Sequence, residues 1–354
     1  MPLVAHNNLP AFEKLSGEGL KVLKPNTAFH QDIRELHIGL LNMMPDAALG
    51  ATERQFFRLI AESNPIAQFF VHPFTIDALP RSETAQKHID EYYETFDQVR
   101  EQGLDALIIS GANVLGSELS GEPFWHPLIE VADWAYDNVT STLCSCLATH
   151  AVLEFRYQQK RETQESKKWG VFEHRVIDQR HPLVADINTR FDVPHSRWNT
   201  VFPEQFEAAG LKLLVTGDDG FVHLATSSDG FRSVFFQGHP EYDTISLLKE
   251  YKRDIQAYAA GELPAYPPLP ENYFGKFEAA VLSEYQSQVY AAMQISADLP
   301  EFPETLILGH LNNTWHDTAC AVVGRWMGLI YQITHRDRDK PFMDGVDIDN
   351  PLNL

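Results

Sequence analysis

Cysteine and basic residues are both scarce in this chain of 354 residues. It has three cysteines, an odd number too small for a disulfide framework, which indicates a reducing compartment. It carries 28 Lys and Arg against 49 Asp and Glu, so the formal net charge is −21. A field of that sign repels phosphate backbones and anionic lipid headgroups. We therefore expect no nucleic-acid partner, and an anionic substrate would need a few local cations.

Long apolar runs are absent as well. No stretch of about 18 uncharged apolar residues exists, so no segment is expected to span a membrane. A signal peptide is not expected either, because MPLVAHNNLPAFEKL lacks a basic region followed by an apolar one. Apolar residues make up 44% of the chain and charged residues 22%, which is typical of a globular protein. These features favour a cytoplasmic enzyme or binding protein.

Short apolar runs alternate with amphipathic segments from residue 36 onward. Strands are predicted at Leu36–Pro45, Gln68–Ile76, Leu104–Asn113 and Val139–Cys144, and helices at residues 51–63, 88–103, 126–138 and 146–159. This alternation predicts an α/β fold, a doubly wound and mostly parallel sheet with helices on both faces. Strands with hairpins are expected between residues 210 and 237, and a helix at about 244–260 closes the core.

The composition divides the chain into three parts. Residues 1–34 are mixed and polar and are interpreted as an N-terminal arm, and residues 35–262 as the α/β domain. Residues 263–354 form a C-terminal extension, which opens with a Pro-rich segment typical of a linker. Two amphipathic helices are predicted within the extension, and we expect them to pack on the core or on a second subunit.

Cys146 lies where an apolar strand runs abruptly into a helix, in TLCSCLATHAVLEF. A nucleophile on such a turn projects above the sheet, and the helix N-terminus favours a thiolate and binds an oxyanion. The alternative is a small buried hydrophobe, since the turn lacks the glycines of a G-x-S-x-G elbow. Cys144 lies inside the apolar run and is expected in the core. A metal pair of these two cysteines with His150 lacks further ligands, so no metal is expected.

A second polar site follows the predicted strand Ser233–Gln237. Gly238 ends that strand, and His239, Pro240 and Glu241 come next. A histidine just past a strand end lies on the edge of the sheet where ligands bind. Glu241 could accept a hydrogen bond from the imidazole and fix its tautomer. The alternative is an exposed turn histidine beside an incidental glutamate, in a chain that has 15 histidines.

The order Cys, His-x-Glu resembles the triad of the class I glutamine amidotransferase-like fold, and within it the homoserine O-acyltransferase family. The resembling segments span about residues 35 to 334 and include VTSTLCSCLATHAVLEF, KKWGVFEHRV, FDVPHSRWN, QGHPEYD and EYKRD. The resemblance implies that Cys146 is the acylated cysteine, His239 the proton acceptor and Glu241 the acid of the triad. It implies no cofactor, because acyl-CoA is a co-substrate, and it implies a homodimer.

The same resemblance implies three substrate-binding residues and one residue that influences the choice of acyl group. Lys167 in SKKWGVFEH matches a substrate-binding lysine, and Ser196 in PHSR matches a residue that shapes substrate choice. Arg253 in EYKRD matches the arginine that holds the amino-acid carboxylate. Taken alone, Lys167 and Arg253 are typical of solvated surface cations. At Leu115 the family has Gly for succinyl transfer or Glu for acetyl transfer, and Leu favours succinyl because it repels no carboxylate.

The expected function is therefore transfer of the succinyl group of succinyl-CoA to the hydroxyl of L-homoserine, in methionine biosynthesis. A thiolate exchanges readily with a thioester, so ping-pong kinetics through an acyl-Cys146 intermediate are expected. Acetyl-CoA as donor and serine as acceptor stay open as alternatives. A glutamine hydrolase or amidotransferase on the same fold is a further alternative, and so is a catalytically dead binding protein.

Overall fold

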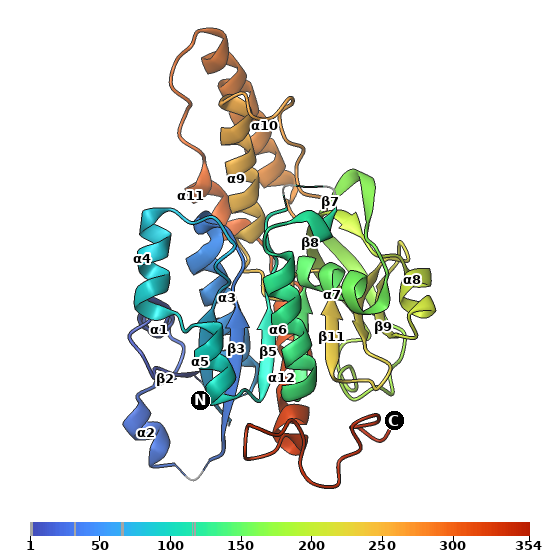
Figure 1. The fold of residues 1–354 in the computed structure, drawn as a ribbon. Helices are drawn as coiled ribbons and strands as arrows, with labels where there is room; N and C mark the ends of the chain where they lie inside the picture. Colours follow the sequence, from blue (N-terminus) through green and yellow to red (C-terminus); the bar gives the residue numbers. More distant parts are fainter. Residues whose placement is uncertain (1–2, 32, 65–66, 115, 117) are drawn as a thin grey trace.

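The computed structural model describes residues 3–31, 33–64, 67–114, 116 and 118–354. Leu115 lies outside the described residues, so its effect on acyl choice stays a prediction from the sequence. The described chain forms an 11-stranded sheet with helices on both faces (Figure 1). The predicted α/β fold with a mostly parallel central sheet is confirmed. None of the described helices is long and apolar enough to cross a membrane.

The sheet has a parallel part and an antiparallel part, in the order β2-β1-β4-β3-β5-β6-β11-β10-β9-β7-β8. The strands joined by parallel pairing are β1 (Leu3–Val4), β2 (Val22–Leu23), β3 (Glu35–Leu41), β4 (Gln68–Phe74), β5 (Ala106–Ile109), β6 (Ser141–Ser145) and β11 (Ser233–Phe236). The antiparallel strands are β10 (Val222–Thr226), β9 (Lys212–Gly217), β7 (Glu162–Val176) and β8 (Arg190–Thr200). Because β1 and β2 extend the sheet, the segment interpreted as an N-terminal arm contributes to its edge.

Helices occupy most of the connections between strands. They are α1 (Pro10–Gly17), α2 (Pro25–Phe29), α3 (Asp46–Ser63), α4 (Glu83–Tyr92), α5 (Phe96–Gln102), α6 (Trp125–Asn138), α7 (Leu147–Tyr157), α8 (Pro203–Ala208), α9 (Ser246–Ala259), α10 (Lys276–Gln294), α11 (Glu304–Ile307) and α12 (His316–Ile333). Helices α9 and α10 project together beyond one end of the sheet (Figure 1). Their buried faces meet through Leu248, Tyr251, Leu282 and Tyr285.

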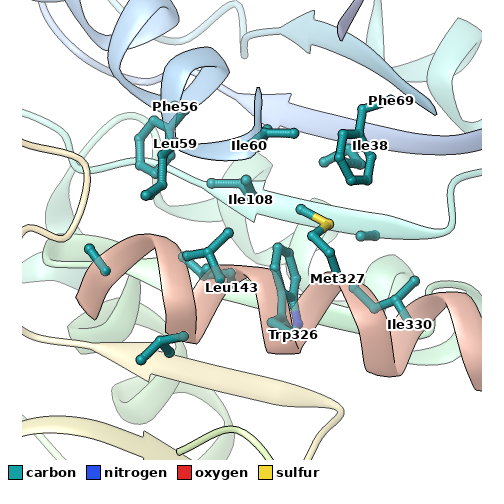
Figure 2. Close-up of a cluster of buried hydrophobic side chains, with 14 of the residues drawn as sticks. Ile38, Phe56, Leu59, Ile60, Phe69, Ile108, Leu143, Trp326, Met327 and Ile330 are labelled. Atoms are coloured by element: carbon teal, nitrogen blue, oxygen red, sulfur yellow. The ribbon is translucent and has the colours of Figure 1, made fainter. Parts of the chain in front are cut away.

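Each face of the sheet has its own hydrophobic core, because successive strand side chains point to opposite sides. Leu143 of β6 belongs to the core under α1, α3 and α12, whereas its neighbour Cys144 belongs to the core under α5, α6 and α7. Figure 2 shows Trp326 and Met327 of α12 on the first face, beside the strands that carry Leu143 and Ile108. Full burial of one such side chain contributes about 1.5–3 kcal/mol. Because these α12 side chains pack against the sheet, the apolar face of α12 is covered by other parts of this chain.

The long hairpin of β7 and β8 was not predicted from the sequence. Its first strand opens with the polar run ETQESKK, which lacks an apolar alternation, and its second strand contains Pro194. Proline within a strand argues against a central position, and β8 is indeed the edge strand of the sheet. This hairpin carries Lys167 and Ser196 to the functional site.

Candidate active site

The pairing of β6 with β11 brings the two predicted polar sites to one edge of the sheet. In these parallel neighbours Ser145 pairs with Phe236, so the two strands end side by side at the same edge of the sheet. Cys146 follows directly and donates its backbone N–H to the Phe236 carbonyl at 2.8 Å. The turn that carries His239 leaves from the adjacent strand. The sheet register thus places the thiol and the imidazole side by side.

Cys146 has the backbone geometry of a strained strand-to-helix turn. Its φ is 51° and its ψ is −106°, a conformation that L-residues rarely adopt, and α7 begins at the next residue. The thiol is partly exposed at the N-terminus of this 11-residue helix, whose first N–H groups have no partner within the helix. Cys144 is buried, and burial raises its pKa to about 12. The prediction that Cys144 is a core residue is confirmed.

His239 and Glu241 form a buried hydrogen-bonded pair. The imidazole Nδ1 lies 2.8 Å from Glu241 Oε1, so the predicted bond between them is confirmed. Burial alone would lower the pKa of His239, but the negative charges of Glu241 and Cys146 raise it well above the usual value. The other ring nitrogen, Nε2, is buried and makes no hydrogen bond of normal geometry in the described structure. Tyr242 stacks on the ring with centroids 4.2 Å apart.

Glu250 of α9 joins two of the predicted substrate-binding residues to this pair, although it was not predicted as a site residue from the sequence. Its Oε2 accepts a hydrogen bond from Ser196 Oγ at 2.5 Å and lies 3.5 Å from Lys167 Nζ. Its Oε1 accepts from Tyr242, the residue stacked on His239, at 2.6 Å. Burial alone would raise the pKa of Glu250, but Lys167, Ser196 and Tyr242 hold it below the usual value.

Arg253 lies on the same helix as Glu250 but is not brought to the triad. Its side chain is 64% exposed, and its guanidinium pairs with the neighbouring Asp254 at 2.9 Å. Asp254 also lies 4.0 Å from Lys167 Nζ, which links this pair to the edge of the site. Glu250, Arg253 and Asp254 are three and four residues apart, so they lie near one another on the helix, but this spacing does not indicate which carboxylate becomes buried.

Two groups of described side chains have ligand atoms close enough together to share a metal ion. One consists of His6, His72 and Glu94, and the other of Glu62, His316 and Cys320. Neither group includes a residue of the triad. The two nitrogens of His72 already face Glu94 at 2.7 Å and His37 at 2.9 Å, so hydrogen bonds account for that cluster.

Comparisons with known proteins identify the family. The family model described as homoserine O-succinyltransferase matches residues 2–336. The chain belongs to the homoserine O-succinyltransferase family. A protein of that name from Allochromatium vinosum is 63% identical over 354 residues, which cover all of this chain and 99% of that protein. Another from Thiobacillus denitrificans is 62% identical over 354 residues, and both chains are covered completely.

Among solved structures, the likeness is weaker. A glutamine amidotransferase from Thermotoga maritima is 11% identical, with a TM-score of 0.42, and the alignment covers 84% of this chain and 98% of that one. A glutamine amidotransferase from Methylobacillus flagellatus is 11% identical, with a TM-score of 0.41, and the alignment covers 77% of this chain and 98% of that one.

The homoserine O-succinyltransferase family is a family of acyltransferases. The resemblance drawn from the sequence motifs is therefore confirmed by the family model and the curated relatives.

Proposed function

We propose that this chain transfers the succinyl group of succinyl-CoA to the hydroxyl of L-homoserine through a thioester on Cys146. The observation that carries the proposal is the Cys146, His239 and Glu241 arrangement in a chain that is 63% identical, over its whole length, to a protein named homoserine O-succinyltransferase. A strained, partly exposed thiol at a helix N-terminus beside an imidazole suits nucleophilic acyl transfer.

In the first half-reaction the Cys146 sulfur attacks the thioester carbonyl of the donor, and the carbon–sulfur bond to CoA breaks. Glu241 and the charge on Cys146 hold a proton on His239, which is available to the departing CoA thiolate. Free N–H groups at the start of α7 suit the developing oxyanion. The products are a succinyl-Cys146 thioester and CoA.

The second half-reaction uses the same imidazole as a base. Acylation removes the negative charge from the Cys146 sulfur, and that charge is one of the causes that raise the pKa of His239. The imidazole then accepts the proton of the homoserine hydroxyl, whose oxygen attacks the thioester carbonyl and releases the Cys146 thiolate. Glu241 orients the ring throughout through its bond to Nδ1.

Lys167, Ser196 and Arg253 are proposed to bind homoserine, and the hydrogen bonds of Glu250 hold the first two beside the triad. Arg253 would clamp the amino-acid carboxylate by turning its exposed guanidinium away from Asp254. Leu115 is proposed to favour the succinyl donor over acetyl-CoA. No cofactor or metal is part of this proposal, since acyl-CoA brings the activated group.

Intact-mass measurement of the purified protein tests the proposal. With succinyl-CoA and no acceptor, the protein is expected to gain one succinyl group, and L-homoserine should then remove it. Cys146→Ala should abolish the gain, whereas Cys320→Ala on α12 should preserve it. A larger gain with acetyl-CoA would point to acetyl transfer, and removal by serine alone would point to a serine acceptor. Release of ammonia from glutamine without any acyl-enzyme would favour the hydrolase alternative.

We also propose that the protein works in the cytoplasm as a homodimer. Its three cysteines are free, which suits a reducing compartment. Exposed apolar side chains of the projecting α10 and α11 region, Phe277, Ile295 and Leu306, are candidates for a subunit contact. Light scattering on the purified protein measures its mass in solution, and a mass of about one chain would contradict the dimer.

A further inference from the structure

Arg197 is a buried guanidinium with one unused nitrogen. It lies in β8 directly after Ser196, and only 4% of the residue is exposed. Its Nε donates to His195 Nδ1 at 3.3 Å, and its Nη1 donates to the Asn199 carbonyl at 2.9 Å. Its Nη2 is buried and has no hydrogen-bond partner in the described part of the chain. An unpaired donor on a buried cation destabilises the folded protein, which suggests that this nitrogen is paired when a ligand is bound.

The surroundings of Arg197 hold the side chain in place but offer it no anion. An arginine only donates, so His195 must accept at Nδ1 and donate from Nε2, which lies 3.2 Å from His174 Nε2. His174 in turn donates from Nδ1 to the Phe172 carbonyl at 2.9 Å. This chain of bonds keeps both histidines neutral. The two rings are therefore a rigid support for the guanidinium and not its counter-charge.

Asp219 is the acidic side chain whose negative charge raises the pKa of Arg197, but both of its carboxylate oxygens already have other partners. Lys168 forms an ion pair with Asp219 Oδ2, and the Phe221 N–H donates to Oδ1 at 3.1 Å. Among the described residues no carboxylate lies within 4.0 Å of the Arg197 guanidinium. Burial therefore lowers the pKa of Arg197 to about 10, a value at which it is still a cation at neutral pH.

Arg197 lies close to the reacting groups. Strand β8 lies beside the turn that carries His239, because the His239 N–H donates a hydrogen bond to the Pro194 carbonyl at 2.9 Å. Gly238 lies against the His195 ring, where an added Cβ would meet Cε1 at 2.9 Å. The charge on the Cys146 sulfur also acts on Arg197, although no hydrogen bond joins them. These contacts place β8 beside the turn that carries His239, so Arg197 is a candidate to contact an acyl group bound to Cys146.

The charge on Cys146 also raises the pKa of a second guanidinium, that of Arg161. It differs from Arg197 in being half-buried and in having the charges of Glu154, Glu122 and Glu118 around it. Both guanidinium groups have a buried nitrogen without a hydrogen-bond partner in the described structure, but Arg197 is the more buried of the two and has fewer carboxylate charges acting on it. A buried Nη2 can still belong to the site, because His239 Nε2 is buried in the same way although His239 interacts with Cys146.

We propose that Nη2 of Arg197 binds the distal carboxylate of the acyl group on Cys146, so that Arg197 selects a dicarboxylic donor such as succinyl-CoA over acetyl-CoA. This inference rests on the proposed acyl-cysteine function. A succinyl group would give Nη2 the charge-assisted partner it lacks, whereas an acetyl group would leave it unpaired.

The test compares three donors: succinyl-CoA, its distal methyl ester and acetyl-CoA. Acylation of Cys146 in the unaltered protein is followed by rapid-quench mass measurement, and the methyl ester should react roughly tenfold to a hundredfold more slowly than succinyl-CoA. Arg197→Gln should slow succinyl-CoA by a similar factor and leave the other two donors nearly unchanged. The matched control is Arg190→Gln in the same strand, an exposed arginine paired with Glu173, which should keep the donor preference.

The outcomes separate this inference from the proposed function. If the unaltered protein forms no acyl-enzyme with any donor, the proposed function fails and the role of Arg197 with it. If it forms the succinyl-enzyme but uses the methyl ester equally well, only the role of Arg197 is overturned, and this comparison needs no variant to fold. The role is also overturned if Arg197→Gln slows all donors equally, or if Arg161→Gln alone removes the preference for succinyl-CoA.

Discussion

The imidazole of His239 and the carboxylate of Glu241 lie 2.8 Å apart with both side chains buried, one residue separating them in the chain. Pro240 between them restricts the backbone, so the pair is held by the turn that follows β11. Glu241 is the first of the two groups that raise the pKa of His239, ahead of Cys146, so loss of its charge should lower that pKa.

Glu241→Gln should reduce succinyl transfer by about 10² to 10⁴ in kcat/KM, the usual contribution of a properly held acid–base group. The amide retains a hydrogen bond but carries no charge, so the pKa of His239 should fall and the pH profile of the reaction should move to lower pH. Steady-state rates between pH 5 and 9 measure both effects. Glu207→Gln, an exposed acid on α8, serves as the control. An unchanged pH profile would mean that Glu241 only holds the turn.

Glu250→Gln should weaken homoserine binding more than it slows acylation. The carboxylate holds Ser196 and Lys167 in place, and an amide would direct N–H donors at the Lys167 ammonium or the Ser196 hydroxyl. We expect the KM for homoserine to rise about tenfold and the stability to fall by about 1.5–3 kcal/mol. Rates at varied homoserine and a urea titration measure the two effects, with Glu262→Gln, exposed beyond α9, as the control. Equal losses for both half-reactions would contradict a role in binding.

The spatial grouping of Cys146, His239 and Glu241 could be predicted because it follows from the order of the strands and from proximity in the chain. Cys146 and His239 each follow a short apolar strand, and the carboxyl ends of parallel strands meet at one edge of the sheet. Glu241 is tied to His239 by proximity in the chain. None of these three placements needed knowledge of which distant side chains would pack together.

Glu250 and Arg197 could not be predicted in the same way. Glu250 lies on a helix rich in charge, and only the docking of α9 against the β7–β8 hairpin decides which carboxylate becomes buried. Arg197 lies in a strand interrupted by Pro194, and its free nitrogen emerges only once His195, Asn199 and their bonds are in place. Long-range pairing of this kind leaves no periodic trace in the sequence.

Ser141→Ala should destabilise the fold by about 1–3 kcal/mol, because two buried groups would lose their partner. The Ser141 hydroxyl accepts from the Trp326 indole N–H at 2.7 Å and donates to the Phe231 carbonyl at 2.5 Å, joining α12 to the strand that ends before Cys146. A lower urea midpoint with an unchanged slope would fit this expectation. Ser283→Ala, at an exposed position of α10, controls for the substitution itself, and equal midpoints for both variants would contradict the prediction.

Stability should fall as the pH drops below about 6.5, because several buried histidines are held neutral. Burial lowers the pKa of His37 and His150 to about 3 and that of His174 to about 4. A folded-state pKa below the unfolded value means that the unfolded chain binds more protons, so the contribution is complete above pH 6.5 and is lost as the pH falls towards 4. Each histidine should cost about 1.4 kcal/mol at pH 5.5, or about 4 kcal/mol for the three.

Thermal unfolding at pH 7.5 and pH 5.5 measures this loss. His239 acts in the opposite direction, since its raised pKa favours the folded state at low pH, but one such group does not offset three. His174→Gln keeps an acceptor for His195 and removes the titrating group, so its midpoint should fall less between the two pH values than that of the unaltered protein. His30→Gln, on the exposed surface, should show the full fall. If both variants lose the same stability on acidification, protonation of the buried His174 is not a cause of the acid sensitivity.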